Sequence, residues 1–225
     1  MNDLPVVHVE NVVKNYQGGK VRALRGVSLE VPQRAFLALA GPSGSGKTTL
    51  LNIIGALDQP DAGIVIVADH DITKLDEKQC TRLRRETIGF VFQSFNLVPV
   101  LTAVENVELP LEILAGTTRD SRRKAAQDML ERVGLMGMND RFPNELSGGQ
   151  QQRVAVARAL VKHPALVLAD EPTANLDGES GSAIIDLMKQ MRDQLGTAFI
   201  FSTHDPRLLE RTETIITLED GCIRS

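Results

Sequence analysis

A glycine-rich segment in the first quarter of the chain has the residue types and spacing of a phosphate-binding loop. It matches the pattern G-x-x-x-x-G-K-[ST] and lies between an apolar run and a helical pattern, the context that such a loop requires. Backbone N–H groups of the loop and the start of the helix would surround phosphates. Lys47 would neutralise the β and γ phosphates, and the Thr48 hydroxyl would bind Mg²⁺. A glycine-rich turn with a structural lysine is the alternative. The segment consists of Gly41, Pro42, Ser43, Gly44, Ser45, Gly46, Lys47, Thr48 and Thr49.

Two adjacent acids follow a second apolar run, residues 165–169. In nucleotide hydrolases with a phosphate-binding loop, an aspartate at the end of such a strand holds the magnesium ion, and Asp170 fits this role through a water molecule. Glu171 is placed to polarise the attacking water, a general-base contribution of typically ~10²–10⁴ in rate. A helix N-cap or a surface acidic pair would also explain these residues.

The elements that must position these residues can be predicted from periodicity. Strand patterns occupy residues 6–13, 27–31, 36–40, 64–67, 88–92, 166–169, 198–202 and 215–218. Helical patterns occupy residues 47–57, 121–133, 150–161 and 179–195. The runs that begin at Phe36, Ile88, Leu166 and Ala198 are almost entirely apolar, which indicates strands covered on both faces of a parallel sheet. We therefore expect an α/β fold, with a helical subdomain inserted between two central strands at about residues 94–162.

Composition limits the classes of function. The 225 residues include 25 basic and 29 acidic ones, a net charge of -4, so a protein that coats nucleic acid is not indicated. Cys80 and Cys222 have no metal-ligand or redox spacing and read as reduced thiols of a cytosolic compartment. The N-terminal residues lack a signal-peptide pattern, and no apolar run approaches the ~18 residues that cross a bilayer. We expect any membrane role to depend on a partner.

A third segment makes the resemblance to a family specific. Leu146-Ser-Gly-Gly-Gln150 precedes an amphipathic helical pattern, and together with the two motifs above it resembles the ABC ATPases over essentially the whole chain. In that family Ser147, Gly148, Gly149 and Gln150 face the γ-phosphate of the nucleotide bound to the other subunit. Without the other motifs, the same residues would be a loop and a helix cap.

The resemblance extends to four single positions. Tyr16 matches the aromatic residue that stacks on adenine, worth roughly 1–3 kcal/mol. Gln93 matches the glutamine that contacts Mg²⁺ and the attacking water, and Asp177 ends the segment Ala174-Asn-Leu-Asp177, which matches the loop that crosses the dimer interface. His204 matches the histidine that contacts the γ-phosphate. Core packing for Tyr16, solvation for Gln93 and a strand-end hydrogen bond for His204 are the structural alternatives.

Taken as a whole, the resemblance implies one domain, residues 1–225, with a RecA-like P-loop NTPase core and a mostly parallel sheet. Residues 1–93 and 163–225 would form this core with an antiparallel β subdomain, and residues 94–162 the helical subdomain. ATP and Mg²⁺ are the implied cofactors. The implied catalytic residues are Lys47, Gln93, Glu171 and His204. The implied metal ligands are Thr48, Gln93 and Asp170.

The resemblance also implies partners. Two copies would close head to tail around two ATP molecules, and because no motif position departs from the family pattern, both sites of a homodimer would hydrolyse ATP. The groove around Gln93, including residues 94–101, would receive a cytoplasmic helix of an integral membrane permease. The chain would then lie at the cytoplasmic face of the inner membrane, peripheral through that partner, with no nucleic acid involved.

The branch of the family is less sharply defined. Residues 88–99, 101–107 and 170–177 look like the lipoprotein-releasing and macrolide-exporter group, whereas cell-division ATPases and small-molecule importers have similar motifs. A non-transport ABC ATPase acting on DNA or ribosomes would usually carry a coiled-coil insertion or a second ATPase module, for which 225 residues leave no room. A solitary P-loop kinase or GTPase would leave residues 146–150 and His204 without a purpose.

Overall fold

The computed structural model describes residues 4–224, and its larger sheet contains the strands that were predicted to be parallel. These strands are β3 (Phe36–Ala40), β6 (Ile88–Phe92), β7 (Leu166–Asp170), β8 (Ala198–Ser202), β9 (Thr214–Glu219) and β10 (Cys222–Arg224). Their order is β10-β9-β3-β8-β7-β6. Neighbours are parallel except β9 and β10, which pair antiparallel at one edge. Parallel strands place their carboxyl ends at one edge of the sheet, where a site can be assembled.

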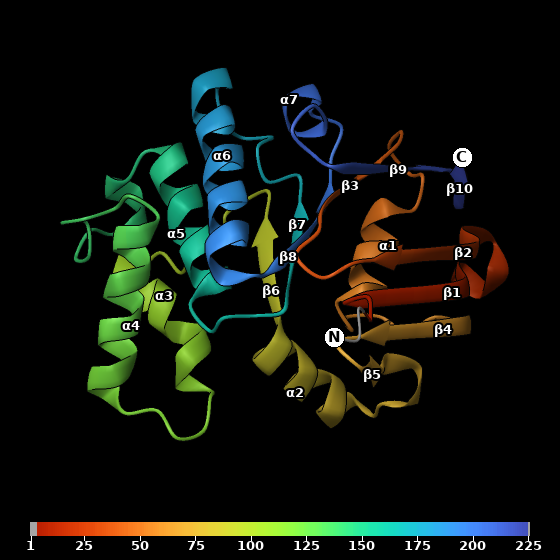
Figure 1. The fold of residues 1–225 in the computed structure, drawn as a ribbon, viewed down its shortest axis with the longest axis horizontal. Helices are drawn as coiled ribbons and strands as arrows, with labels where there is room; N and C mark the ends of the chain where they lie inside the picture. The colour runs from red at the N-terminus through yellow and green to blue at the C-terminus, as the bar shows by residue number, and fades with distance from the viewer. Residues whose placement is uncertain (1–3, 225) are drawn as a thin grey trace.

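A smaller antiparallel sheet lies at one side of the molecule, and the helices of residues 103–160 lie at the other side (Figure 1). Its strands are β1 (Val7–Tyr16), β2 (Val21–Val31), β4 (Ala62–Val67) and β5 (His70–Asp71), in the order β2-β1-β4-β5. β1 ends at Tyr16. The antiparallel sheet therefore delivers this aromatic residue toward the carboxyl ends of the parallel strands.

Helices cover both faces of the larger sheet (Figure 1). They are α1 (Lys47–Ile54), α2 (Glu77–Thr87), α3 (Ala103–Glu112), α4 (Arg119–Arg132), α5 (Gly148–Leu160), α6 (Gly178–Leu195) and α7 (Pro206–Leu209). α3, α4 and α5 lie together, and the segment that contains them joins β6 to β7. None of the helices in residues 4–224 combines the length and apolarity that crossing a membrane requires.

The alternation of side chains along the parallel strands divides the core in two. Phe36, Phe199 and Phe201 face a cluster formed with α3 to α6, whereas Leu37 and Ile200 face a cluster formed with α1, α2 and the antiparallel sheet. All five side chains are at most 1% exposed. Burial on both faces explains the continuous apolar runs and fixes the strands that carry the site.

The structure departs from the sequence-based expectations at several elements. β5, β10, α2, α3 and α7 were not predicted. α2 buries only Cys80 and Leu83, α3 contains Pro110, which would ordinarily end a helical pattern, and α7 has four residues. The expectation of an insertion between two central strands was also wrong in one respect, because β6 is an edge strand of the described sheet. Residues 1–3 and 225 of the expected single domain lie outside the described residues.

Candidate nucleotide-binding site

The glycine-rich loop connects β3 to α1 and is packed too closely for side chains at two of its glycines. Gly46, the N-cap of α1, has φ 106°, and a Cβ there would lie 2.5 Å from the carbonyl oxygen of Ala23. A Cβ at Gly41, where φ is 140°, would lie 2.0 Å from the carbonyl oxygen of Leu218. Only glycine fits both positions, since left-handed φ angles and close backbone contacts exclude larger residues.

Lys47 lies across the loop that it follows. Its Nζ atom donates hydrogen bonds to the carbonyl oxygens of Gly41 and Pro42 at 2.8 and 2.9 Å, and the residue is 9% exposed. The hydroxyl of the next residue, Thr48, is 3.5 Å from Oδ2 of Asp170 at the end of β7. The loop thus presents an ammonium group and the N-terminus of α1 to one space, which is the arrangement that binds phosphate groups.

Glu171 directly follows β7 and has a strained backbone. Its φ is 46°, a left-handed conformation that is uncommon outside glycine, and its N–H donates to the carbonyl oxygen of Ser202 at 2.8 Å. Its carboxylate lies 2.6 Å from Nδ1 of His204 and accepts a 3.3 Å hydrogen bond from the hydroxyl of Thr203. Backbone and side-chain contacts therefore hold the carboxylate at the carboxyl ends of β7 and β8.

Tyr16 closes the opposite side of the same space. Its hydroxyl donates to Oδ2 of Asp58 at 2.7 Å, and Nζ of Lys14 lies 5.1 Å from the centre of its ring. Burial and the hydrogen bond to Asp58 raise the pKa of the Tyr16 phenol, so the donor proton is retained. The ring orientation is thereby fixed at the edge of the pocket.

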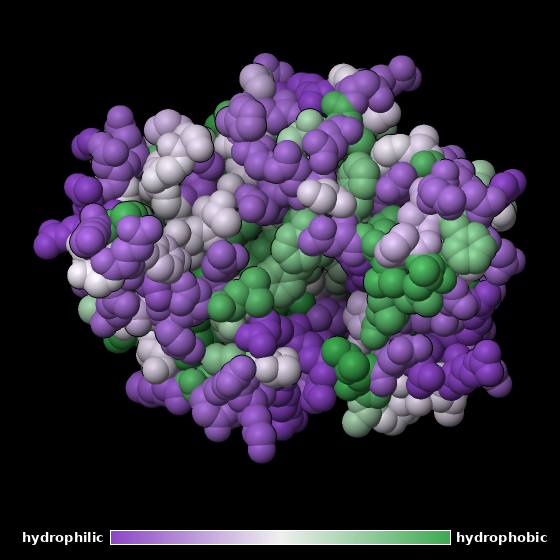
Figure 2. Space-filling model, turned by 180° about the vertical axis from the view of Figure 1, so that it is seen from behind, coloured by the Kyte–Doolittle hydropathy of each residue, from purple (hydrophilic) through white to green (hydrophobic). Residues whose placement is uncertain are grey.

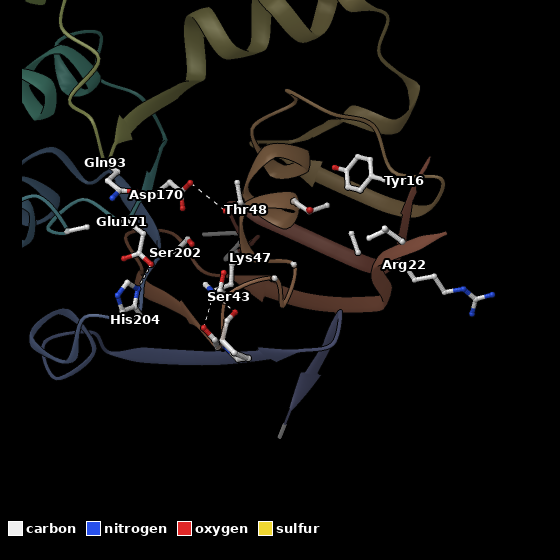
Figure 3. A pocket seen from close by; sticks show the side chains of 18 residues that line it. Tyr16, Arg22, Ser43, Lys47, Thr48, Gln93, Asp170, Glu171, Ser202 and His204 are labelled. Atoms are coloured by element: carbon white, nitrogen blue, oxygen red, sulfur yellow. Dashed lines mark hydrogen bonds and ion pairs between the residues drawn. The ribbon is translucent and has the colours of Figure 1, made fainter. Parts of the chain in front are cut away.

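These residues line one pocket of about 750 Å³ (Figure 3). Among the predicted residues, Figure 3 labels Tyr16, Ser43, Lys47, Thr48, Gln93, Asp170, Glu171 and His204 around it. The loop residues Gly41, Pro42, Gly44, Gly46 and Thr49 also line the pocket. Ser45 is not part of the lining; it is 2% exposed. Five lining residues were not among the predicted site residues: Val21, Arg22, Ala23, Ala174 and Ser202. Ala174 begins the segment that was matched to the interface loop, and the other four belong to no motif.

The remaining predicted residues lie outside this pocket. Ser147 is the N-cap of α5 and accepts a hydrogen bond from the N–H of Gln150. Asp177 is the N-cap of α6, and hydrogen bonds from Ser180 lower its pKa. A Cβ at Gly149 would lie 3.4 Å from Ser180, so the starts of α5 and α6 are adjacent. Residues 146–150 and 174–177 therefore form two adjacent segments, and of these residues only Ala174 lines the pocket.

Asn175, a residue that the motif comparison did not single out, connects this pair of segments to the pocket. Its Nδ2 atom donates to the carbonyl oxygen of Gln93 at 3.0 Å. A side-chain amide bound to a distant backbone carbonyl leaves no trace in the spacing of a sequence. The signal that could have found it is its place between Ala174 and Asp177 in the loop before α6.

Comparison with known proteins identifies the family. The family model described as "ABC transporter" matches residues 24–174, which include the glycine-rich loop, Gln93, residues 146–150 and Glu171. The chain belongs to the ABC transporter family. The predicted fold class, with its P-loop core, is confirmed by solved cassettes of this family. The family match and the solved cassette bound to ADP and Pi also confirm the predicted ATP binding and ATPase activity.

Relatives of this ABC ATPase match it over nearly its whole length. An uncharacterised ABC transporter ATP-binding protein of Methanocaldococcus jannaschii is 45% identical and covers 96% of this chain and 94% of its own. A lipoprotein-releasing system ATP-binding protein, LolD, of Saccharophagus degradans is 46% identical, with 97% and 96% covered. A solved dimer of the Methanocaldococcus cassette, in a post-hydrolysis state bound to ADP and Pi, has a TM-score of 0.88 at 44% identity and covers 97% of both chains.

Proposed function

We propose that two copies of this ATPase close head to tail around two ATP molecules and drive an integral membrane permease. The observation that carries this proposal is the division of the site. The pocket collects Tyr16, Lys47 and Glu171, whereas residues 146–150 and 175–177 do not line it. The α5 N-terminus with its free N–H groups suits a phosphate that a second copy would supply. The dimeric arrangement of the related cassette supports this reading.

Four side chains of the pocket have defined roles in ATP hydrolysis under this proposal. Tyr16 stacks on the base, Lys47 and the loop N–H groups bind the β and γ phosphates, and Glu171 accepts a proton from the attacking water. His204 orients Glu171 and donates to the γ-phosphate once ATP is bound. Because the transition state of phosphoryl transfer is stabilised mainly by positioning and charge, these fixed groups account for the chemistry.

The oxygen donors around the phosphate space suit a magnesium ion. The hydroxyl of Thr48, the carboxylate of Asp170 and the side-chain amide of Gln93 all line the pocket. Carboxylate, hydroxyl and amide oxygens are the ligands that Mg²⁺ takes together with phosphates and water. We infer that these three residues hold the ion, which neutralises charge on the β and γ phosphates when bound.

A groove on the face seen from behind the view of Figure 1 is the proposed docking place of the permease. Figure 2 shows this face, with apolar surface gathered around a hollow near its middle. The groove, of about 500 Å³, runs between α2, β6, α3 and α5. Of the residues expected to form the docking groove, 93–101, its lining includes Asn96 but not Gln93. Apolar lining residues Phe90, Leu109 and Ile113 occur beside the cations Arg84 and Lys162. An apolar helix that carries an acidic residue would fit it, and docking there would place the chain at the cytoplasmic face of the membrane.

The branch that we propose is the lipoprotein-releasing and macrolide-export group. Relatives named as lipoprotein-releasing ATP-binding proteins, from Shewanella to Legionella, share 42–46% identity with this chain. By contrast, cbiO1 of Clostridium perfringens, described as part of the cbiONQ transporter complex, is 29% identical at a TM-score of 0.91, with 100% of this chain and 88% of its own covered. The higher identity supports release from, or export across, the membrane.

Co-purification tests this proposal. Tagged Glu171→Gln protein, loaded with Mg·ATP in its native host, is extracted gently with detergent and its partners are identified by mass spectrometry. We expect a membrane subunit with few spans and a large extracytoplasmic domain, and an ATP-dependent dimer of the purified variant by light scattering. A permease with many spans would overturn the branch, and a monomer at all ATP concentrations would overturn the dimer.

A further inference from the structure

An arginine outside the pocket joins the loop of His204 to the segment that precedes α6. Arg207, in α7, donates from Nη1 to the carbonyl oxygen of Asp177 at 3.1 Å. Its Nε and Nη2 atoms donate to the carboxylate of Asp205 at 3.0 and 2.6 Å. The guanidinium group is planar and has donors on several sides, so one side chain can hold both groups at fixed positions.

Asp205 continues this connection toward the proposed catalytic carboxylate. Its Oδ2 atom accepts a 2.6 Å hydrogen bond from the hydroxyl of the buried Thr173, which follows Glu171 by two residues. Its N–H donates to the hydroxyl of Thr203 at 3.0 Å, and that hydroxyl donates to Glu171 at 3.3 Å. The side chain and the backbone N–H of Asp205 therefore link Arg207, through Thr203, to Glu171. Arg207 also holds the pKa of Asp205 down to about 2, so the pair stays charged at any working pH.

Gly181, in the first turn of α6, provides the space for the guanidinium group. A Cβ at this position would lie 2.7 Å from Nη1 and 2.9 Å from Cζ of Arg207. Nearby, α7 lies beside the beginning of α6 (Figure 1). Because Gly181 is helical, an alanine there would suit the backbone and would instead displace the guanidinium group.

We infer that Arg207 is a positioning residue for ATP hydrolysis, which fixes segment 174–177 to the loop that carries His204. Asn175 ties the same segment to the carbonyl oxygen of Gln93, so the segment is held at both ends. The inference rests on the proposed function, because segment 174–177 has to contact a second copy. A displacement of this segment when the dimer closes would then reach His204 and Glu171, because their positions relative to the segment are fixed.

Three variants test the inference: Arg207→Ala, Arg207→Lys and Gly181→Ala. We expect each to lower kcat for ATP hydrolysis by about tenfold or more, because small displacements of catalytic groups have large effects on rate. Lysine can pair with Asp205 but has no fork to reach Asp177 as well. The Kd for ADP should stay within about twofold of the parent's, since none of the substituted residues lines the pocket. Thermal unfolding is measured in parallel.

A double substitution and a matched control make the test specific. Arg207→Ala with Gly181→Ala should hydrolyse ATP no more slowly than Arg207→Ala alone, because both changes remove the same contact. Arg211→Ala removes another arginine–carboxylate pair to α6, Arg211 with Asp186 at 3.1 Å, and should keep the parent's kcat. Parent-like rates in the three test variants would overturn the inference, as would rate losses matched by equal losses of ADP affinity and stability. A parent that fails to hydrolyse ATP would overturn the proposed function as well.

Discussion

Nδ1 of His204 lies 2.6 Å from Oε1 of Glu171, and the two residues come from the ends of neighbouring parallel strands. The Glu171 side chain is 18% exposed and that of His204 is 77% exposed. The second carboxylate oxygen of Glu171 accepts a hydrogen bond from Thr203. Both oxygens are thus engaged, and the carboxylate is oriented before any nucleotide enters the pocket.

Removing this histidine should slow hydrolysis without weakening nucleotide binding much. His204→Ala leaves Glu171 with one of its two side-chain partners and removes the proposed donor to the γ-phosphate. We expect kcat to fall by a factor on the order of 10² and the Kd for ATP to change by about threefold or less. A phosphate-release assay and an equilibrium titration measure the two quantities. His70→Ala, at an exposed strand outside the pocket, is the control and should behave as the parent.

If Tyr16 stacks on the adenine base, removing its ring should weaken ATP binding measurably. Tyr16→Ala should raise the Kd for ATP by roughly 5- to 150-fold, the range that corresponds to 1–3 kcal/mol of stacking. Tyr16→Phe keeps the ring and loses the hydrogen bond to Asp58, so it should stay within about fivefold of the parent. Tyr16 is the only tyrosine in a chain without tryptophan, so its own fluorescence reports binding in the parent. An unchanged Kd in Tyr16→Ala would contradict base stacking.

From the proposed magnesium ligands we expect one substitution to weaken the magnesium dependence of ATP binding. Asp170→Asn keeps the size of the side chain and removes its negative charge. We expect the parent to bind ATP more tightly with Mg²⁺ than with EDTA and the variant to show a smaller difference, because Thr48 and Gln93 remain as proposed ligands. Isothermal titration in the two buffers measures the difference. If the variant keeps the parent's full magnesium dependence, Asp170 is not a ligand.

A pH dependence of stability follows from Lys162. Burial lowers the pKa of its ammonium group from 10.5 to about 8, although Nζ donates to the carbonyl oxygens of Arg84 and Arg85. Between these two pKa values the unfolded chain binds more protons than the folded one, so the free energy of unfolding rises with pH. From pH 7 to pH 9.5 the gain from this group is about 2 kcal/mol at most.

Lys162→Met isolates the contribution of this lysine. The variant lacks the titrating group, so its free energy of unfolding should rise less over the same pH range than that of the parent. Urea unfolding at several pH values between 7 and 9.5 measures the difference. Equal pH dependence in parent and variant would show that the pKa of Lys162 is not lowered by folding.

Prediction from sequence succeeded where one physical signal dominated a segment. β3, β6 and β8 match the predicted bounds because each strand is mostly buried and almost entirely apolar. α2 was missed because its apolar residues are few, although the capping box of Asp76 and Gln79 marks its start. β5 and β10 are too short for an alternating pattern to emerge.

Within the candidate site, motifs located the groups on the pocket wall but not the contacts that hold them. The spacing of the glycine-rich loop and the strand-end acids follows from local backbone requirements and is visible in the sequence. The bonds of Asn175 to Gln93 and of Arg207 to Asp177 join residues far apart in the chain. Such contacts depend on the packing of α6 and α7, which no short pattern encodes.

The proposed division of the site between two copies is tested most directly by mixing two inactive variants. Lys47→Ala disables the phosphate-binding loop of its own chain. Gly148→Asp places a negative charge where the partner's γ-phosphate would bind, yet suits the start of α5, where an acid is favourable. Neither homodimer should hydrolyse ATP.

In a mixed dimer the intact loop of Gly148→Asp meets the intact residues 146–150 of Lys47→Ala. With random pairing, half of the dimers are mixed and each has one intact site, so we predict about a quarter of the parent's activity for an equimolar mixture. Activity no greater than the sum of the two separate variants would contradict a site shared between two copies.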